Sequence, residues 1–325
     1  MLKKINIPSF KEISNVFSPF IKLANNNKWI ILLLMLLVMY LLFKISETVV
    51  VPYNQEGFTS DEVNQRYIFK NKDIYDDFYV KIYDELIEDP NKIEGELLQI
   101  IEVSKMDKNS KILDIGSGTG HHVGYLQSQG MNVTGLDKSS EMVKRSKENY
   151  PDANFINGDM GDSFLFSSDQ FSHITCLYFT LYYEKNKKHL FENCNNWLKD
   201  KGYFIFHLVD KFNFDPIINA ADPLHVVDPQ HYTDKRIEDS IVVFNDFTYK
   251  SKFTITENTN RAKFTELFKF KKNGNIRQNE HILYMERQNE IIQMVKDAGF
   301  SFVDRIDLGT IGYENQFIYV FQNSK

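Results

Sequence analysis

Three glycines at alternate positions follow a short apolar run, and they are Gly116, Gly118 and Gly120. The run carries one acid, Asp114, and predicts a buried strand over 111–116 that ends in a turn opening a helix. Glycine has no Cβ, so it accepts positive φ and lets backbone N–H groups approach a ligand closely. The G-x-G-x-G spacing is tighter than the G-x-G-x-x-G of dinucleotide-binding turns. The loop therefore indicates a bound organic ligand at this strand end.

Two later strand ends carry further acids. Asp137 lies about 20 residues beyond the glycine loop, where an acid can accept hydrogen bonds from both hydroxyls of a ribose. Asp159 and Met160 follow the next apolar run. Each feature also has an ordinary interpretation, because glycine loops are often tight turns and acids are common at helix entries and turns. The order of the three features along successive strand ends favours one ligand site.

The stretch ILDIGSGTG, within 111–120, resembles motif I of class I methyltransferases that depend on S-adenosylmethionine (SAM). The resemblance covers 67–325 and implies that the loop backs the amino-acid and sulfonium portion of SAM. It also implies that Asp159 accepts from the adenine amino group, that Met160 covers the ring, and that the helix at 75–84 caps the cofactor. The candidate cofactor-binding residues are Asp114, Gly116, Ser117, Gly118, Gly120, Asp137, Lys138, Asp159, Met160 and Tyr178.

Methyl transfer is an in-line displacement at the sulfonium methyl, so the enzyme chiefly supplies proximity and alignment. A base is needed only if the acceptor arrives protonated. His207, at the end of the run 203–209, is the leading candidate, and a core position on the outer face of its strand is the alternative. Tyr182 is the second catalytic candidate, and Tyr183, Asp210, His225 and His231 are further ones.

Two other histidine-containing features have an ordinary interpretation. His121 and His122, at a helix start, are interpreted as exposed helix residues, with a supporting role beside the ligand as the alternative. His225, Asp228 and His231 are interpreted as solvated loop residues, so no metal site is expected.

The elements that position these residues alternate between strand and helix. This order predicts an α/β fold with a doubly wound, mostly parallel seven-stranded sheet. The last two strands, 300–307 and 316–322, are expected to form an antiparallel hairpin. Residues 211–285 break the alternation and predict an inserted antiparallel β layer over the carboxyl edge of the sheet. The strands of the main sheet are expected at 111–116, 131–137, 153–157, 171–179, 203–209, 300–307 and 316–322.

Residues 29–43 are uninterrupted apolar residues with one tyrosine. A full membrane span needs about 20 residues, with about 17 as the lower limit, so a short transmembrane helix is predicted over 29–45. Trp29, Tyr40 and Lys44 are typical of interfacial anchors. The alternatives are a cleaved signal peptide, which would need a small-residue cleavage site, and a buried soluble helix, which would show a polar face.

The chain is thus divided into a polar basic segment 1–28, a transmembrane helix 29–45, a tether 46–66 and a methyltransferase domain 67–325. Positive charge before the span would place the N-terminus in the cytosol and the domain across the membrane. Cytosolic SAM and two unpaired cysteines favour a cytosolic domain. We expect a single-pass membrane protein with its domain on the cytosolic side, the orientation being left open.

The net charge of −6 argues against bulk nucleic-acid binding. We therefore expect a membrane-tethered, SAM-dependent methyltransferase that acts on a small-molecule or protein acceptor. One alternative is a catalytically inert SAM-binding or interaction module at a membrane. Another is an NAD-dependent oxidoreductase, against which the glycine spacing and Asp159 speak.

Overall fold

The computed structural model describes Leu36 and residues 65–221, 230, 233, 235–256 and 259–325. Contacts divide the chain into the units Met1–Asp61 and Glu62–Lys325, and the second unit contains the strands of both sheets. The predicted segment 1–28, transmembrane helix 29–45 and tether 46–66 lie outside the described residues, apart from Leu36 and the end of the tether. Within the part of the chain that is described, no helix is long and apolar enough to cross a membrane.

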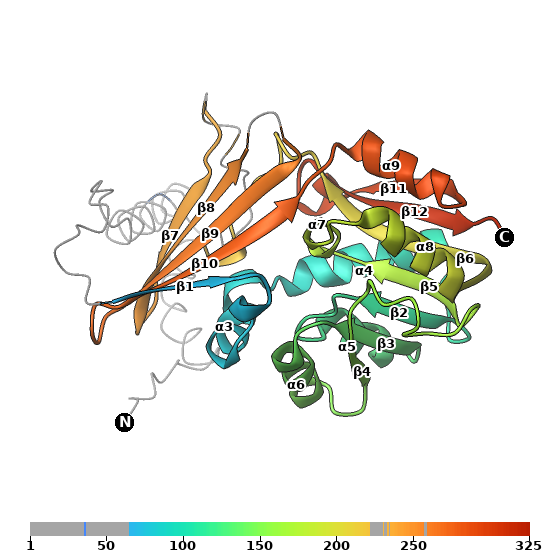
Figure 1. Ribbon diagram of the computed structural model, residues 1–325, viewed down its shortest axis with the longest axis horizontal. Helices are drawn as coiled ribbons and strands as arrows, with labels where there is room; N and C mark the ends of the chain where they lie inside the picture. Colours follow the sequence, from blue (N-terminus) through green and yellow to red (C-terminus); the bar gives the residue numbers. More distant parts are fainter. Residues whose placement is uncertain (1–35, 37–64, 222–229, 231–232, 234, 257–258) are drawn as a thin grey trace, which may run out of the picture. The chain divides into compact units, whose positions relative to one another are not determined.

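The larger sheet has seven strands in the order β11-β12-β6-β5-β2-β3-β4 (Figure 1). The five strands from β6 to β4 pair in parallel, whereas β12 is antiparallel to both β6 and β11. This arrangement confirms the predicted doubly wound, mostly parallel sheet with an antiparallel terminal hairpin. The strands are β2 (Lys111–Ile115), β3 (Asn132–Asp137), β4 (Asn154–Asn157), β5 (Phe171–Cys176), β6 (Leu198–Val209), β11 (Phe300–Asp307) and β12 (Gln316–Asn323).

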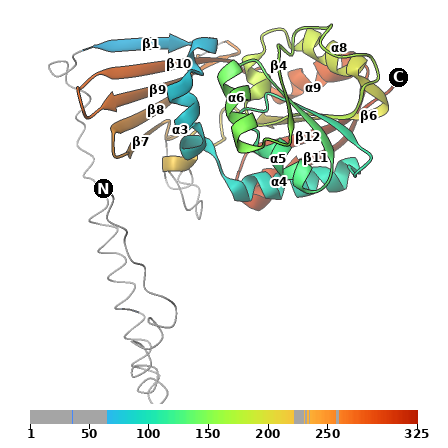
Figure 2. The same ribbon diagram turned by 90° about the horizontal axis from the view of Figure 1, so that it is seen from below.

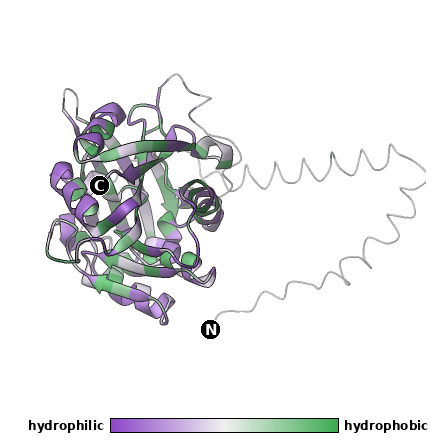
Figure 3. Cartoon of the chain, turned by 90° about the vertical axis from the view of Figure 1, so that its right-hand side faces the viewer, coloured by the Kyte–Doolittle hydropathy of each residue, from purple (hydrophilic) through white to green (hydrophobic). Residues whose placement is uncertain are grey.

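Two apolar cores cover the two faces of this sheet. Side chains alternate along a strand, so Ile112 of β2 packs in one core, and Leu113 and Ile115 pack in the other. The first core includes residues of α4, α5 and α6, and the second includes residues of α8 and α9. In Figure 3 the outer helices carry many hydrophilic residues, as expected for helices with one buried face. These helices are α4 (Pro90–Ser104), α5 (His121–Ser128), α6 (Ser140–Asn149), α8 (Lys187–Trp197) and α9 (Gln288–Asp297).

A second sheet of five strands has the order β1-β10-β9-β8-β7, which can be followed in Figure 2. Its last four strands are antiparallel, which confirms the inserted β layer predicted within 211–285. The strands are β1 (Arg66–Lys70), β7 (Asp239–Val243), β8 (Phe247–Ile255), β9 (Arg261–Phe270) and β10 (Ile276–Tyr284).

The edge strand β1 was not predicted, because it is five residues long, mostly exposed, and pairs in parallel with the distant β10. It leads through the 3-10 helix η2 (Asn71–Ile74) into α3 (Asp77–Ile87). The Asp76 carboxylate caps α3 by accepting from the Tyr79 N–H at 3.0 Å. Phe78 of α3 packs edge-on against the rings of Phe247, Phe268 and Phe270. The second sheet is thereby held to the helix that precedes the larger sheet.

Candidate active site

A cavity of about 870 Å³ lies at the carboxyl ends of β2, β3, β4 and β5. In open α/β sheets this is the edge at which ligands bind. Its walls come from the glycine loop, from α3 and α4, and from the second sheet. All of the predicted cofactor-binding residues except Gly120 line it. The structure therefore brings these residues together, and the contact of each with SAM stays a prediction.

The three glycines have different reasons for lacking a side chain. All have positive φ, at +70° for Gly116, +53° for Gly118 and +93° for Gly120. A Cβ on Gly116 would lie 2.3 Å from Thr180 Cγ2, and one on Gly120 would lie 2.7 Å from Phe155 Cζ. At Gly118 no atom of the described chain lies within 4 Å of the ideal Cβ position. Gly116 and Gly120 are thus needed for packing, whereas Gly118 borders the open cavity.

Asp137 fastens the glycine loop to the end of β3. Its Oδ2 accepts from the Gly118 N–H at 2.9 Å, and its Oδ1 accepts from the Ser139 N–H at 2.8 Å. Burial raises the pKa of this carboxyl, and the two N–H donors favour its charged form. Each oxygen keeps a further lone pair, so the carboxylate can still accept from a ligand hydroxyl.

Asp114, on β2, is almost completely buried beneath the loop. Its Oδ1 accepts from the Thr175 hydroxyl at 2.7 Å, and burial raises the pKa of the carboxyl. The bond to β5 fixes the carboxylate at the junction of the two central strands. Asp114 therefore lies at the floor of the cavity.

Asp159 and Lys138 form an ion pair across neighbouring strand ends, with Lys138 Nζ 2.5 Å from Asp159 Oδ2. Asp159 Oδ1 accepts from the Gly161 N–H at 3.0 Å. Partial burial opposes ionisation of Asp159, but Lys138 and the Gly161 N–H outweigh it and hold the pKa of the carboxyl below its usual range. Met160 lies beside this pair and lines the same cavity.

Tyr178 follows β5 with φ of +52°, in the left-handed region that favours glycine. Its ring lines the cavity, and Lys92 Nζ lies 4.6 Å from the ring centroid. Its carbonyl accepts from His207 Nδ1–H at 2.8 Å. Strained backbone of this kind persists only where the surroundings hold it, and it is common at ligand sites.

The structure does not bring the two predicted catalytic residues into the cavity. His207 is fully buried, and burial together with the positive charge of Lys92 lowers its pKa to about 4. The Tyr182 hydroxyl accepts from the Val209 N–H at 2.8 Å, and the side chain is buried. Neither residue is among the described ones that line the cavity. This placement favours the core position for His207. The sequence prediction missed it because the sequence does not show which face of the strand points to the site.

A wall of tyrosines also lines the cavity, and the sequence pointed to parts of it through Tyr178, Tyr183 and the helix at 75–84. The wall contains Tyr75, Tyr79, Tyr83, Tyr178 and Tyr183. Behind it lies a buried polar cluster on β9 and β10, in which His281 Nδ1 is 2.8 Å from the Tyr183 hydroxyl. The signal that could have revealed this cluster is the polar run from Arg277 to His281 inside the β layer predicted within 211–285. All five residues of the run are buried.

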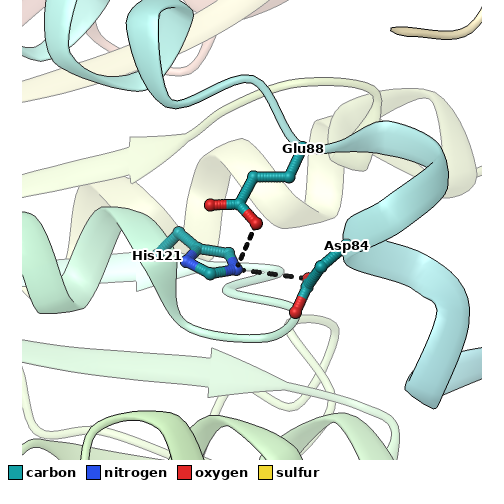
Figure 4. Close-up of side chains that lie close together, drawn as sticks. All are labelled: Asp84, Glu88 and His121. Atoms are coloured by element: carbon teal, nitrogen blue, oxygen red, sulfur yellow. Dashed lines mark ion pairs between the residues drawn. The ribbon is translucent and has the colours of Figure 1, made fainter. Parts of the chain in front are cut away.

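His121, at the start of α5, joins this helix to α3 (Figure 4). Its Nε2 lies 3.2 Å from both Asp84 Oδ1 and Glu88 Oε2, and its Nδ1 lies 2.7 Å from the Tyr150 hydroxyl. The Thr119 hydroxyl donates to Asp84 Oδ1 at 2.6 Å. The carboxylate and imidazole atoms of Asp84, Glu88 and His121 lie within 4.8 Å of one another. The cluster therefore ties α3 to the end of the glycine loop.

His122 makes a comparable contact with α4. Its Nε2 lies 2.6 Å from Oε1 of the buried Glu96, whose Oε2 is 3.8 Å from Lys92 Nζ. The interpretation of both histidines as exposed helix residues is wrong, because their side chains are only 21% and 19% exposed. The acids that hold them come from helices far away in the sequence. The loop candidates His225, Asp228 and His231 lie outside the described residues.

Comparison with known proteins agrees with this geometry. Residues 112–202 match the family described as "Methyltransferase domain". The phosphoethanolamine N-methyltransferase of Plasmodium falciparum is 28% identical over 174 residues, which are 48% of this chain and 62% of that protein. A dTDP-3-amino-3,6-dideoxy-alpha-D-glucopyranose N,N-dimethyltransferase of Streptomyces fradiae is 35% identical over 71 residues, 22% of this chain and 27% of that protein. The chain thus spans less than two thirds of both relatives.

Solved structures share the fold. The methyltransferase CcbJ from Streptomyces caelestis matches with a TM-score of 0.60 and 15% identity, over 78% of this chain and 100% of that one. An amino pentose methyltransferase from Micromonospora echinaspora with SAM bound matches with a TM-score of 0.55 and 16% identity, over 78% and 99%. The chain therefore carries a methyltransferase domain on a Rossmann-like fold. The match to the methyltransferase family makes this an enzyme domain, and one structure with the same fold has SAM bound.

Proposed function

We propose that this chain transfers the methyl group of SAM to the nitrogen of a small-molecule amine. The observation that carries this proposal is the tyrosine wall, which shares one cavity with the glycine loop. Aromatic faces attract cations, and the attraction is stronger where water is excluded. An amine acceptor suits such a wall, because it enters or leaves with a positive charge on nitrogen.

The names of three curated relatives support an amine acceptor, whereas a fourth is named for O-methylation of malonyl-[acyl-carrier protein]. One relative is named for N-methylation of phosphoethanolamine, and another for N,N-dimethylation of an amino sugar nucleotide. A solved structure with the same fold is a sugar N-methyltransferase, with a TM-score of 0.54. All three names describe methylation of nitrogen, and the first two name small acceptors. The alternative to a small amine is a protein acceptor, and the acceptor test described below includes proteins.

The residues present fit the cofactor. The missing side chain of Gly118 leaves open space beside the loop, and the Asp137 carboxylate next to it can accept from ribose hydroxyls. Asp159 and Met160 line the same cavity, and we propose that they contact the adenine end of the cofactor. When bound, SAM supplies an electrophilic methyl group on a sulfonium. The contribution of the chain is then to orient the acceptor nitrogen, exclude water and receive a proton from the acceptor.

The acceptor test compares matched molecules. The full chain is incubated with SAM and either phosphoethanolamine or the same molecule with a hydroxyl in place of the amine. Mass spectrometry of the products should show a methyl group added to the amine and none to the alcohol. Methylation of the alcohol would contradict nitrogen specificity. Binding of SAM without turnover of these molecules or of amino sugars and proteins would favour the inert module.

We further propose that residues 29–45 tether the protein to a membrane, with the domain on the cytosolic side. The support is the apolar run itself, since Leu, Ile, Val and Phe each favour insertion by roughly 0.3–0.6 kcal/mol at a helix centre. The full-length chain should remain with membranes after an alkaline carbonate wash. Its recovery in the supernatant would contradict the anchor, and protease protection in sealed vesicles would contradict the cytosolic orientation.

A further inference from the structure

A chain of hydrogen bonds runs from the cavity into the second sheet. The Tyr183 hydroxyl is 2.8 Å from His281 Nδ1, and His281 Nε2 is 2.8 Å from Glu266 Oε2. Tyr183 is 37% exposed, whereas His281 and Glu266 are 2% and 0% exposed. The chain thus begins at a hydroxyl that borders open space and ends at a carboxylate closed off from water.

Glu266 is held in its charged form by its neighbours. Its Oε1 accepts from the Tyr249 hydroxyl at 2.9 Å, and its Oε2 accepts from the Asn279 amide at 3.0 Å. Burial alone would raise the pKa of this carboxyl, but the hydrogen bonds from His281 and Asn279 outweigh it and lower the pKa below its usual range. A buried carboxylate that is ionised and fully hydrogen-bonded can stabilise a cation beside it.

The bond directions follow from the types of groups. A carboxylate only accepts, so His281 Nε2 carries the proton that it shares with Glu266. In the neutral imidazole Nδ1 is then an acceptor, and the Tyr183 hydroxyl donates to it. The lone pairs of the Tyr183 oxygen remain for other donors, among them the Tyr75 hydroxyl. This arrangement can receive a proton at Tyr183 and pass one on.

We propose that Tyr183, His281 and Glu266 form a proton relay that deprotonates the ammonium group of the acceptor. This inference rests on the proposed function. The ammonium N–H proton moves to the Tyr183 oxygen while the Tyr183 proton moves to His281 Nδ1. The acceptor nitrogen regains its lone pair, Tyr183 ends unchanged, and the imidazolium formed pairs with Glu266. Tyr183 is the catalytic residue, and His281 and Glu266 act through it.

Transfer through Tyr183 to His281 avoids a free tyrosinate. Partial desolvation in the cavity wall, together with the charge of Glu266, raises the pKa of Tyr183 above its ordinary value, so its anion is disfavoured at neutral pH. Passing the proton directly to His281 removes the need for that anion. Tyr183, His281 and Glu266 thus follow the order of many catalytic sites, in which a hydroxyl contacts a histidine and a carboxylate orients that histidine.

Several elements bring titratable or charged groups to this site, and any pH effect involves them together. Their shared feature is direct or near contact with His281 or Glu266. They are Tyr75 after η2, Tyr79 on α3, Tyr183 on α7 (Thr180–Tyr183), Tyr249 on β8, Glu266 on β9, and Arg277 on β10, whose Nε donates to Asn279 at 2.9 Å.

The test uses the full chain with SAM and the fastest of three acceptors: phosphoethanolamine, ethanolamine and 3-amino-3-deoxyglucose. Tyr183→Phe and His281→Gln interrupt the relay at two points. Tyr319→Phe and His173→Gln are the matched controls, because both remove buried hydrogen-bonding groups away from the cavity. The measurements are kcat as a function of pH, SAM affinity by calorimetry, and the ¹⁵N signals of His281 in the ligand-free protein.

At pH 7 both relay variants should lose at least roughly 100-fold in kcat, the lower bound for general base catalysis, with SAM affinity unchanged. The loss should shrink as pH approaches the pKa of the amine, because the acceptor then arrives already deprotonated. The controls should stay within about threefold of the wild type. The ¹⁵N spectrum should show neutral His281 with its proton on Nε2.

Three results would overturn the relay while leaving the proposed function intact. They are unchanged kcat in both relay variants, an equal loss at every pH, which indicates a structural role, and a His281 already protonated on both nitrogens at pH 7. A wild-type protein that methylates none of the amines would instead overturn the proposed function, and the relay with it.

Discussion

Gly118→Ala should separate the cofactor site from the stability of the fold. Gly118 has φ of +53° and Gly130 has φ of +79°, so an alanine at either position is forced into the left-handed region. That conformation costs roughly 1–2 kcal/mol for a residue with a Cβ. Neither site has a steric clash, since the described atoms nearest a Cβ on Gly130 are those of the flexible Lys108 side chain at 3.5 Å or more. Gly130→Ala is therefore a matched control.

The two variants differ only in what the new methyl group faces. At Gly118 it enters the cavity, where it competes with a bound ligand for space. Overpacking of this kind costs about 1–3 kcal/mol, which corresponds to a loss of roughly 5- to 150-fold in affinity. Calorimetric titration with SAM should show this loss for Gly118→Ala and wild-type affinity for Gly130→Ala, with similar melting temperatures for both. Equal SAM affinity in the two variants would refute the assignment of the loop.

Asp137 and His122 each give a further prediction. Asp137→Ala leaves the Gly118 and Ser139 N–H groups without their acceptor, at about 1–3 kcal/mol for each one that stays unpaired, so the melting temperature without ligand should fall and SAM binding should weaken. An unchanged melting temperature would show that water replaces the carboxylate. The hydrogen bond that His122 makes to the Glu96 carboxylate raises the pKa of His122 above 6.5, despite the opposing effect of burial. The contribution of His122 to the stability of the fold is therefore fully present below pH 6.5 and is lost as pH rises through the raised pKa. The stability difference between wild type and His122→Gln should accordingly decrease above pH 6.5, and a difference independent of pH would contradict this.

The gathering of the candidate cofactor-binding residues around one cavity could be predicted because these residues follow local rules. The glycines and Asp137 stand at strand ends, and the carboxyl ends of parallel strands meet at one edge of the sheet. The face that His207 turns toward its surroundings could not be predicted in the same way, because both faces of a central strand are buried.

The acceptor half depends on contacts between distant parts of the chain. Tyr183 and His281 are separated by 98 residues, and the register that pairs Glu280 with Thr265 on β10 and β9 decides which side chains face the cavity. No local pattern specifies that register or the parallel pairing of β1 with β10. The same holds for the ion pairs of His121 with Asp84 and Glu88, which depend on how α3 packs.

If one cavity binds SAM and directs its methyl group to the nitrogen of a small amine, the transferred carbon can be followed from sulfur to nitrogen. The most direct measurement follows SAM labelled with ¹³C in its methyl group by NMR, with the full chain and phosphoethanolamine present. We predict that the sulfonium methyl signal decays while an N-methyl signal of equal intensity grows. A label that appears on oxygen or on the protein, or that stays on SAM while calorimetry shows SAM bound, would contradict the account.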